Sequence, residues 1–208
     1  MLAEVASQRV LPVVQLRRVE DAAWLGPLLL EAGLRCVEVM LRTAAAPAAI
    51  AALADRDGLL VAAGTVREAA DVDRAVASGA RLVVSPAGNE AVSLRARSLG
   101  VPELPGVMTP TELEAALRAG AEAVKLFPAE LAGGVAAVRA LAGPFPEARF
   151  VPTGGIGPAE APAYLREASV LAVGGSWMVP PAMIEAGRGD EVARLLSEAA
   201  TLARGEEL

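Results

Sequence analysis

The 208-residue sequence contains no histidine, only one cysteine and few aromatic side chains. Without histidine, the chain cannot form serine–histidine or cysteine–histidine nucleophile pairs, use imidazole acid–base catalysis or build a histidine-ligated metal site. The single cysteine, Cys36, excludes an intrachain disulfide and is typical of a reducing compartment such as the cytoplasm. Any catalysis must therefore use carboxylates, Arg, Lys, hydroxyls or backbone dipoles.

Long hydrophobic runs and basic clusters are also missing. The mean hydropathy is +0.44, yet no apolar run reaches the roughly 18 residues that a membrane-spanning helix needs. The N-terminus, MLAEVASQRV, lacks the basic and then apolar order of a signal peptide. High hydropathy without a span favours strands that are buried on both faces. A net charge of −6 without a basic patch argues against nucleic acid as a partner.

Lysine is almost absent, because the 19 basic residues are 18 arginines and Lys125. A nucleotide bias toward arginine codons is sufficient to explain this scarcity. A lysine that survives such a bias is nevertheless enriched at positions where arginine cannot serve, and one such task is that of a neutral amine nucleophile. The neighbourhood of Lys125 has to decide between chance and this task.

Short apolar runs alternate along the chain with runs of helical periodicity. We expect strands at Val10–Gln15, Arg35–Leu41, Leu59–Ala63, Leu82–Ser85, Leu104–Val107, Ala123–Phe127, Arg149–Pro152 and Val170–Val173. We expect helices at about Val19–Ala32, Ala46–Asp55, Val66–Ser78, Glu90–Ser98, Pro110–Ala119, Val135–Ala142, Pro158–Glu167 and Asp190–Ala203, with a further short helix before Arg9. Eight strand–helix units with short connections predict one α/β domain over residues 1–208, a closed (β/α)8 TIM barrel. The alternative is an open doubly wound sheet, but the first strand is not followed by the glycine-rich turn usual in that fold.

A weak internal repeat relates three of these units. The segments EAGLRCVEV, ASGARLVVS and RAGAEAVKL each combine a helix end, a glycine and a strand. The fifth residue after each glycine is Glu38, Val84 and Lys125, respectively. Because strand side chains alternate between faces, equivalent positions point the same way. If that direction is inward, a carboxylate and an amine meet inside one barrel.

Glu38 and Lys125 are the candidate catalytic pair. A glutamate in the middle of a buried strand is rare because an unpaired buried charge is costly; it serves either in a structural ion pair or as a general acid–base. Lys125 is either a side chain that extends to the barrel rim or an amine nucleophile activated by an apolar environment and a nearby cation. Arg42 has the strand parity of Glu38 and is a candidate for that cation.

Two more strand ends carry candidate binding residues. Thr65 follows the third strand at the end of the barrel where substrates bind, although it could also cap the following helix. Pro86 follows the fourth strand, where it either terminates the strand or shapes the pocket wall.

Two glycine-rich stretches occur where the seventh and eighth strands are expected to end, around Gly154–Gly155 and Gly174–Gly175. Phosphate sites in these barrels commonly use those two loops, because glycine lets an anion approach backbone N–H groups closely. Tight turns also use glycine, but two such pairs in the two expected loops, one of them followed by Ser176, favour phosphate binding.

Together these motifs resemble the class I 2-keto-3-deoxy-6-phosphogluconate (KDPG) aldolases and 2-keto-4-hydroxyglutarate (KHG) aldolases. The resemblance is collinear from about Ser7 to Arg204 and is carried by Glu38–Thr43, Gly64–Val66, Ser85–Pro86, Lys125–Glu130, Pro152–Ile156 and Gly174–Trp177. It implies a cytoplasmic homotrimer that cleaves KDPG, a phosphorylated keto acid, to pyruvate and glyceraldehyde 3-phosphate, and needs no cofactor or metal. Met40, Ala87 and Leu126 depart from residues common in the family and bear on pocket shape.

The resemblance also implies a role for each matching residue. Lys125 corresponds to the Schiff-base lysine and Glu38 to the general acid–base, which works through a bound water. The remaining substrate-binding positions are Arg42 and Thr65 for the pyruvyl carboxylate, Pro86 and Phe127 for the pocket wall, Thr153 for the substrate hydroxyls, and Gly154, Gly155, Gly175 and Ser176 for the phosphate.

Other functions remain possible from the sequence alone. The substrate could instead be the galactonate-derived keto acid or 4-hydroxy-2-oxoglutarate. The barrel could be a phosphosugar isomerase or epimerase, which needs an acid–base pair but no lysine imine. It could also be a non-catalytic binder of a phosphorylated metabolite, although such a protein would have little reason to bury a glutamate opposite a lysine.

Overall fold

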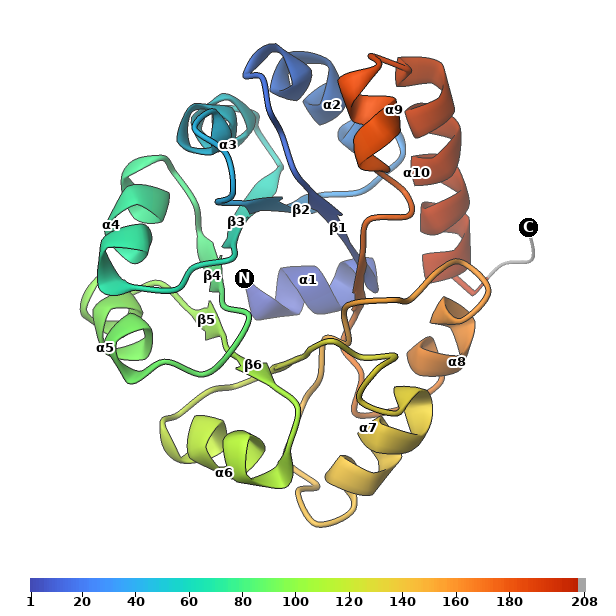
Figure 1. Ribbon diagram of the computed structural model, residues 1–208. Helices are drawn as coiled ribbons and strands as arrows, with labels where there is room; N and C mark the ends of the chain where they lie inside the picture. Colours follow the sequence, from blue (N-terminus) through green and yellow to red (C-terminus); the bar gives the residue numbers. More distant parts are fainter. Residues whose placement is uncertain (206–208) are drawn as a thin grey trace.

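The computed structural model describes residues 1–205, whereas residues 206–208 of the expected domain lie outside the described part. Parallel strands form a curled sheet, and most of the helices lie outside it (Figure 1). The strands are β1 (Val10–Val14), β2 (Cys36–Met40), β3 (Leu60–Gly64), β4 (Leu82–Val84), β5 (Glu103–Leu104), β6 (Gly106–Val107), β7 (Lys125–Leu126) and β8 (Val173–Gly175). The helices are α1 (Leu2–Gln8), α2 (Glu20–Glu31), α3 (Ala46–Ala54), α4 (Ala69–Ala77), α5 (Glu90–Ser98), α6 (Pro110–Arg118), α7 (Gly134–Ala142), α8 (Ala161–Leu165), α9 (Pro181–Glu185) and α10 (Gly189–Ala203).

Six strands form one sheet in the order β5-β4-β3-β2-β1-β8, while β6 and β7 form a separate parallel pair. β2 and β3 pair over five residues, from Cys36 opposite Leu60 to Met40 opposite Gly64. β5 and β6 belong to one segment that is interrupted at Pro105, which has no N–H to donate to a neighbouring strand. The expected parallel α/β sheet is therefore confirmed, but the expected strand at Leu104–Val107 is broken.

The later strands are also shorter than the sequence predicted. β7 has two residues, and the expected strand at Arg149–Pro152 is represented by isolated bridges from Phe150 to Val124 and Val170. The strand expected at Val170–Val173 is displaced, since β8 begins at Val173. The prediction of eight regular strands is thus wrong for this part of the chain. Proline explains part of the difference, because residue 152 cannot donate a backbone hydrogen bond to a ladder.

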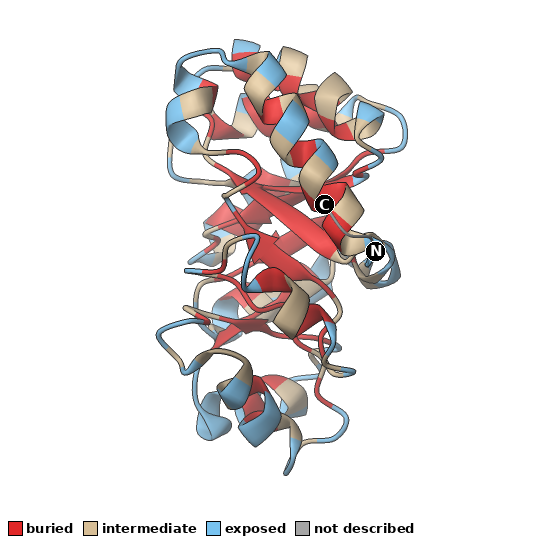
Figure 2. Ribbon diagram, turned by 90° about the vertical axis from the view of Figure 1, so that its right-hand side faces the viewer, coloured by how far each residue is buried: buried red, intermediate tan, exposed pale blue. Residues whose placement is uncertain are grey.

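Side chains on one face of the strands form an apolar cluster inside the curled sheet. Its buried members are Val5, Leu11, Cys36, Leu60, Ala62, Leu82, Val84, Leu104, Ala123, Val151 and Ala172. The opposite faces of the strands pack against the helices, and Figure 2 shows the buried strands between partly exposed helices. Val5 comes from α1, so the expected N-terminal helix is confirmed. In Figure 1 this helix lies behind the strands, where it covers the inner cluster. The opposite end of the strands remains available for a site.

Most helices form where periodicity predicted them, although their ends differ. α10 has a buried stripe that includes Val192, Leu196, Ala199 and Leu202. α8 covers only the middle of the expected Pro158–Glu167 helix, and α9 had not been predicted. Within residues 1–205, we find no helix with the length and apolar character needed to cross a membrane.

Candidate active site

Glu38 and Lys125 meet inside the curled sheet. Lys125 Nζ donates to Glu38 Oε1 at 3.0 Å and to Oε2 at 3.2 Å. Glu38 is 1% exposed and Lys125 is 5% exposed, so the pair lies almost entirely out of water. The geometry confirms that the equivalent repeat positions point inward. An amine held beside a carboxylate in a buried position can undergo proton exchange and, once neutral, attack a carbonyl.

Gly64 makes room for the Glu38 side chain. It lies opposite Met40 at the end of the β2–β3 ladder. A Cβ atom built on Gly64 would lie 2.2 Å from Glu38 Oε1 and 2.7 Å from Glu38 Cγ. The ion pair with Lys125 restrains the carboxylate, so it cannot easily move aside. The sequence showed this glycine but gave no signal that it contacts Glu38 across the ladder.

Arg42 and Thr65 form a polar pair just beyond the ends of β2 and β3. Arg42 Nε donates to Thr65 Oγ1 at 3.1 Å. Thr65 has a φ of 60°, a left-handed backbone conformation that is unusual for a β-branched residue. It does not cap α4, because Glu68 is the N-cap residue there and shares a capping box with Asp71. The helix-cap interpretation of Thr65 is therefore wrong, and its hydroxyl instead faces an arginine.

Phe127 and the Thr153–Gly155 turn lie close to Lys125. The Phe127 ring centroid is 5.4 Å from Lys125 Nζ. A Cβ atom on Gly154 would lie 3.2 Å from the Phe127 ring, which places the turn against this residue. Gly154 and Gly155 have φ values of 102° and 83°, which only glycine adopts readily. The sequence thus produces a close-packed turn whose backbone can approach a bound group.

The second glycine pair differs from its expected place. Gly174 and Gly175 belong to β8 itself rather than to a loop after it, and both are buried. Gly174 forms a bridge with Thr153, and a Cβ atom on it would lie 2.3 Å from Thr153 Oγ1. A Cβ atom on Gly175 would overlap the Trp177 ring. Close packing accounts for both glycines, and the exposed Ser176 is the first residue beyond the strand.

Backbone contacts through Gly106 connect Pro86 to Lys125. A Cβ atom on Gly106 would lie 2.2 Å from the Pro86 carbonyl oxygen, and Gly106 pairs with Lys125 between β6 and β7. The preceding Ser85 is fully buried and donates to Glu103 Oε1 at 3.0 Å. These contacts place Pro86 beside the strand pair that carries Lys125.

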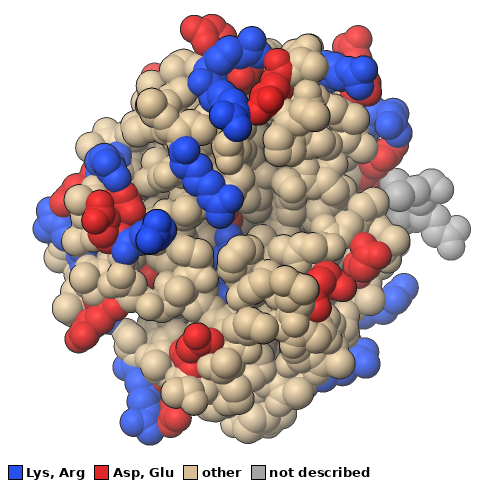
Figure 3. Space-filling view, viewed as in Figure 1, with Lys and Arg blue, Asp and Glu red and all other residues tan. Residues whose placement is uncertain are grey.

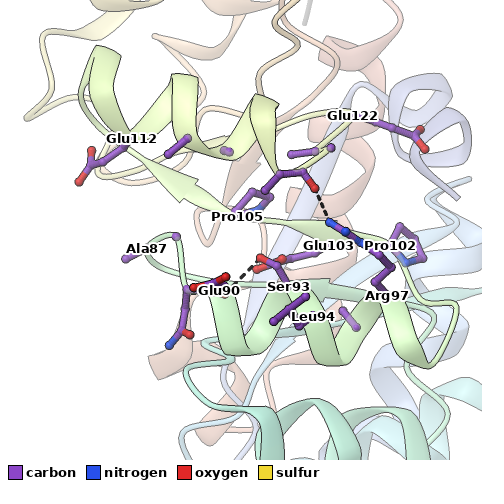
Figure 4. Close-up of a pocket in the computed structure, with 18 of the residues that line it drawn as sticks. Ala87, Glu90, Ser93, Leu94, Arg97, Pro102, Glu103, Pro105, Glu112 and Glu122 are labelled. Carbon is purple, nitrogen blue, oxygen red and sulfur yellow. Dashed lines mark hydrogen bonds between the residues drawn. The ribbon is translucent and has the colours of Figure 1, made fainter.

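A separate groove of about 640 Å³ lies on the outside of the sheet between α5 and α6. Figure 4 shows Arg97 reaching across it to donate to the Ala119 carbonyl, with Glu103 at its base. The lining includes Ala87 but neither Lys125 nor Glu38. In Figure 3, basic side chains instead extend toward a hollow in the middle of the face on which the strands end. An anionic substrate is thus favoured at the strand ends rather than in the outer groove.

Cys36 lies on the same face of β2 as Glu38 but does not offer a nucleophile. Its thiol donates to the Val10 carbonyl oxygen at 3.4 Å. Burial, with a smaller contribution from Glu4, raises the pKa of this thiol to about 12. The thiolate form is therefore scarce near neutral pH, and Lys125 remains the candidate nucleophile.

Comparison with known proteins fits this geometry. Residues 2–195 match the model of the family described as KDPG and KHG aldolase. This chain belongs to that aldolase family. It is 47% identical over 188 residues to a 2-dehydro-3-deoxy-phosphogluconate aldolase of Treponema pallidum, covering 90% of each chain. It is 40% identical over 191 residues to a KHG/KDPG aldolase of Escherichia coli K12, covering 91% of this chain and 90% of that one.

Among solved structures, the chain resembles a KDPG aldolase of Legionella pneumophila with a TM-score of 0.92 and 33% identity, covering 96% of this chain and 98% of that one. That structure contains pyruvate captured at low pH as a covalent carbinolamine intermediate. The family resemblance drawn from the motifs is therefore confirmed.

Proposed function

We propose that this chain is a Schiff-base aldolase that cleaves KDPG to pyruvate and glyceraldehyde 3-phosphate, with Lys125 as the nucleophile. The observation that carries the proposal is the buried contact of 3.0 Å between Lys125 Nζ and Glu38 Oε1. Aldolase activity is the activity of the family to which the chain belongs. Family membership therefore favours this function over an isomerase, an epimerase or a non-catalytic binder.

The first half of the reaction forms an imine. The neutral amine of Lys125 attacks C2 of the keto acid, and loss of water from the carbinolamine gives a protonated imine. The carbinolamine in the Legionella structure, in which pyruvate is bound covalently, supports this step. The positive imine nitrogen is the electron sink that the next step requires.

The second half breaks the C3–C4 bond. Glu38 accepts the proton of the C4 hydroxyl, the C4–O bond becomes a carbonyl, and the electron pair of the broken bond moves to the enamine on Lys125. Glyceraldehyde 3-phosphate then leaves. Glu38 returns a proton to C3, and water hydrolyses the resulting imine to release pyruvate and free Lys125. A bound water between Glu38 and the substrate, as the resemblance implies, would extend the reach of the carboxylate.

The remaining residues bind and orient the substrate in this proposal. Arg42 and Thr65 bind the pyruvyl carboxylate, because a guanidinium and a hydroxyl beside each other match its oxygen atoms. Phe127 and Pro86 form the pocket wall, and Thr153 contacts substrate hydroxyls. Backbone N–H groups of the Gly154–Gly155 turn and of Gly175 at the end of β8, together with the Ser176 hydroxyl, bind the phosphate. The positions that we assign to the phosphate are Gly154, Gly155, Gly175 and Ser176.

We further propose that the curled sheet closes as a (β/α)8 barrel in one domain. Backbone hydrogen bonds that continue past the regular strands support closure, since Val151 N donates to Val124 O at 2.8 Å and Gly174 N donates to Pro152 O at 2.9 Å. The family resemblance supports a homotrimer in the cytoplasm. Size-exclusion chromatography with light scattering measures the oligomeric state, and a monomer at micromolar concentration contradicts that part of the proposal.

The substrate is tested by cleavage kinetics on three keto acids. We expect kcat/KM to be highest for KDPG, lower for its galactonate-derived stereoisomer and measurable for 4-hydroxy-2-oxoglutarate, the substrate that the Escherichia coli relative's name includes. Pyruvate released from each keto acid is measured with a coupled dehydrogenase. Absence of cleavage of all three would overturn the proposed function, whereas a preference for the stereoisomer would correct only its substrate.

A further inference from the structure

Tyr164 is the only tyrosine in the chain, and its hydroxyl reaches from the core to a surface carboxylate. The residue lies in α8 and is 1% exposed. Its hydroxyl donates to Glu130 Oε1 at 2.5 Å. Burial and the bond to Glu130 raise the pKa of Tyr164 above its ordinary value, so the hydroxyl remains a donor. Neither residue has a part in the reaction steps above.

Glu130 contacts the Gly154–Gly155 turn through both its backbone and its side chain. Glu130 N donates to the Gly154 carbonyl oxygen at 3.1 Å. A Cβ atom on Gly155 would lie 2.8 Å from Glu130 Cβ and 2.9 Å from Glu130 Cγ. Gly155 therefore rests on the aliphatic part of the Glu130 side chain, and the direction of that side chain sets the space available to the turn.

The hydrogen bond between Tyr164 and Glu130 also connects the two segments that flank the turn. Ala129 N donates to the Thr153 carbonyl oxygen at 2.9 Å, which fixes the start of the turn beside the end of β7. The chain leaves the turn, passes the Gly157 N to Glu160 Oε2 bond of 2.9 Å and enters α8. Tyr164 then returns to Glu130. Contacts at residues 153 and 157 thus restrain the two ends of the turn, and the Glu130 side chain, held by Tyr164, supports its middle.

We propose that Tyr164 is a positioning residue that, through Glu130, holds the Gly154–Gly155 turn in the conformation that binds the substrate phosphate. This inference rests on the proposed function only for the identity of the phosphorylated ligand. The turn has two consecutive glycines with positive φ, so its backbone has many alternative conformations unless neighbours restrict them. Without the hydrogen bond from Tyr164, the Glu130 side chain can adopt other rotamers, and Gly155 then loses the fixed packing of Glu130 Cβ and Cγ against it.

The test compares KDPG with the same keto acid lacking its phosphate in wild type and in Tyr164→Phe, which keeps the buried ring. We expect KM for KDPG to rise about three- to tenfold, less than the full effect of losing a hydrogen bond to a charged acceptor, because the bond acts on the turn only through Glu130. We expect kcat to change less than twofold, and kinetics on the unphosphorylated analogue to stay within twofold of wild type. An equal change for both substrates, or none for either, overturns the inference.

Two further variants separate positioning from general stability. Glu130→Gln keeps an acceptor for the tyrosine hydroxyl, and we expect its KM for KDPG to remain within about twofold of wild type. Glu167→Gln removes the negative charge from the ion pair of Glu167 with Arg139 on α7, which lies away from the turn, and serves as the matched control. A KM rise in the control as large as in Tyr164→Phe contradicts a role specific to the turn.

Amide hydrogen exchange tests the inference independently of turnover. We expect the peptide that contains residues 153–157 to exchange faster in Tyr164→Phe than in wild type or Glu167→Gln, and inorganic phosphate to protect it less. Unchanged exchange overturns the inference even if the enzyme is active. A wild-type protein that cleaves no keto acid but shows the expected exchange pattern contradicts the proposed function alone.

Discussion

The two halves of the sheet differ in regularity. We call β1–β4 the regular arc, because β1, β2 and β3 each contain five residues and β4 contains three. We call residues 103–175 the broken arc, because its strands have two or three residues and are joined partly by isolated bridges. Figure 1 shows broad arrows in the regular arc and mostly loop-like backbone in the broken arc.

Each arc supplies a different part of the candidate site. The regular arc holds Glu38 in a continuous ladder and the Arg42–Thr65 pair at its end. The broken arc supplies Lys125 and the Gly154–Gly155 turn, and among the residues that the structure describes neither glycine N–H donates to a backbone carbonyl. Regular strands thus hold a buried charge in a fixed position, whereas interrupted strands leave N–H groups for a ligand.

The largest effect is expected in the broken arc from Lys125→Arg. Arginine keeps the positive charge beside Glu38 but cannot become a neutral nucleophile. We expect turnover of KDPG to fall about a thousandfold or more. Steady-state kinetics and thermal unfolding by circular dichroism measure the two quantities together. Activity near wild type in a folded variant would refute the assignment of Lys125.

The next effect is expected in the regular arc from Glu38→Gln. The amide fills the same space but cannot accept the C4 hydroxyl proton, so we expect kcat to fall about 10²- to 10⁴-fold. Lys125 remains present, and borohydride should still trap pyruvate on it. Loss of trapping with retention of cleavage would contradict the assignment of Glu38 as the acid–base and Lys125 as the nucleophile.

A smaller effect is expected from Gly64→Ala, which crowds Glu38 against its ladder. The added methyl group would lie 2.2 Å from Glu38 Oε1. We expect a loss of about 1–3 kcal/mol in the free energy of unfolding, together with a lower kcat. Gly88→Ala is the control, because its added Cβ atom would have no neighbour closer than 4.0 Å. Equal urea midpoints for both variants would show that the regular arc does not hold Glu38 rigidly.

The smallest effect concerns the Cys36 thiol, which reports on opening of the regular arc. Because burial raises its pKa to about 12, we expect iodoacetamide to label native protein far more slowly than urea-unfolded protein at about pH 8.

The raised pKa of Cys36 contributes stability below the ordinary thiol pKa, and this contribution is lost as the pH rises toward about 12. Stability should therefore fall more steeply between about pH 9 and 12 in wild type than in Cys36→Ala. Rapid labelling of native protein would contradict a closed regular arc.

The regular arc could be predicted from the sequence more closely than the broken arc. Its strands consist of continuous apolar runs, and the repeat placed Glu38 and Lys125 on the same inner face. In the broken arc, apolar composition predicted strands at Arg149–Pro152 and Val170–Val173 that the backbone forms only in part. Prolines and glycines determine the pairing there, and their effect depends on neighbours distant in sequence.

Contacts across the site were the least predictable part. Gly64 lies 26 residues from Glu38 in the chain, and Tyr164 lies 34 residues from Glu130. The sequence displayed both pairs, but only the register of β2 and β3 and the position of α8 bring them together. Gly174 and Gly175 show the opposite case, because the sequence motif predicts a loop and the two residues lie in a strand.

The central claim is that Lys125 forms an imine with the keto acid product. Incubation of the wild-type protein with pyruvate and sodium borohydride, followed by peptide mass spectrometry, tests it most directly. We predict a reduced pyruvyl adduct on the peptide that contains Lys125, and no such adduct when either pyruvate or borohydride is omitted. An unmodified Lys125 in protein that cleaves KDPG would contradict the account.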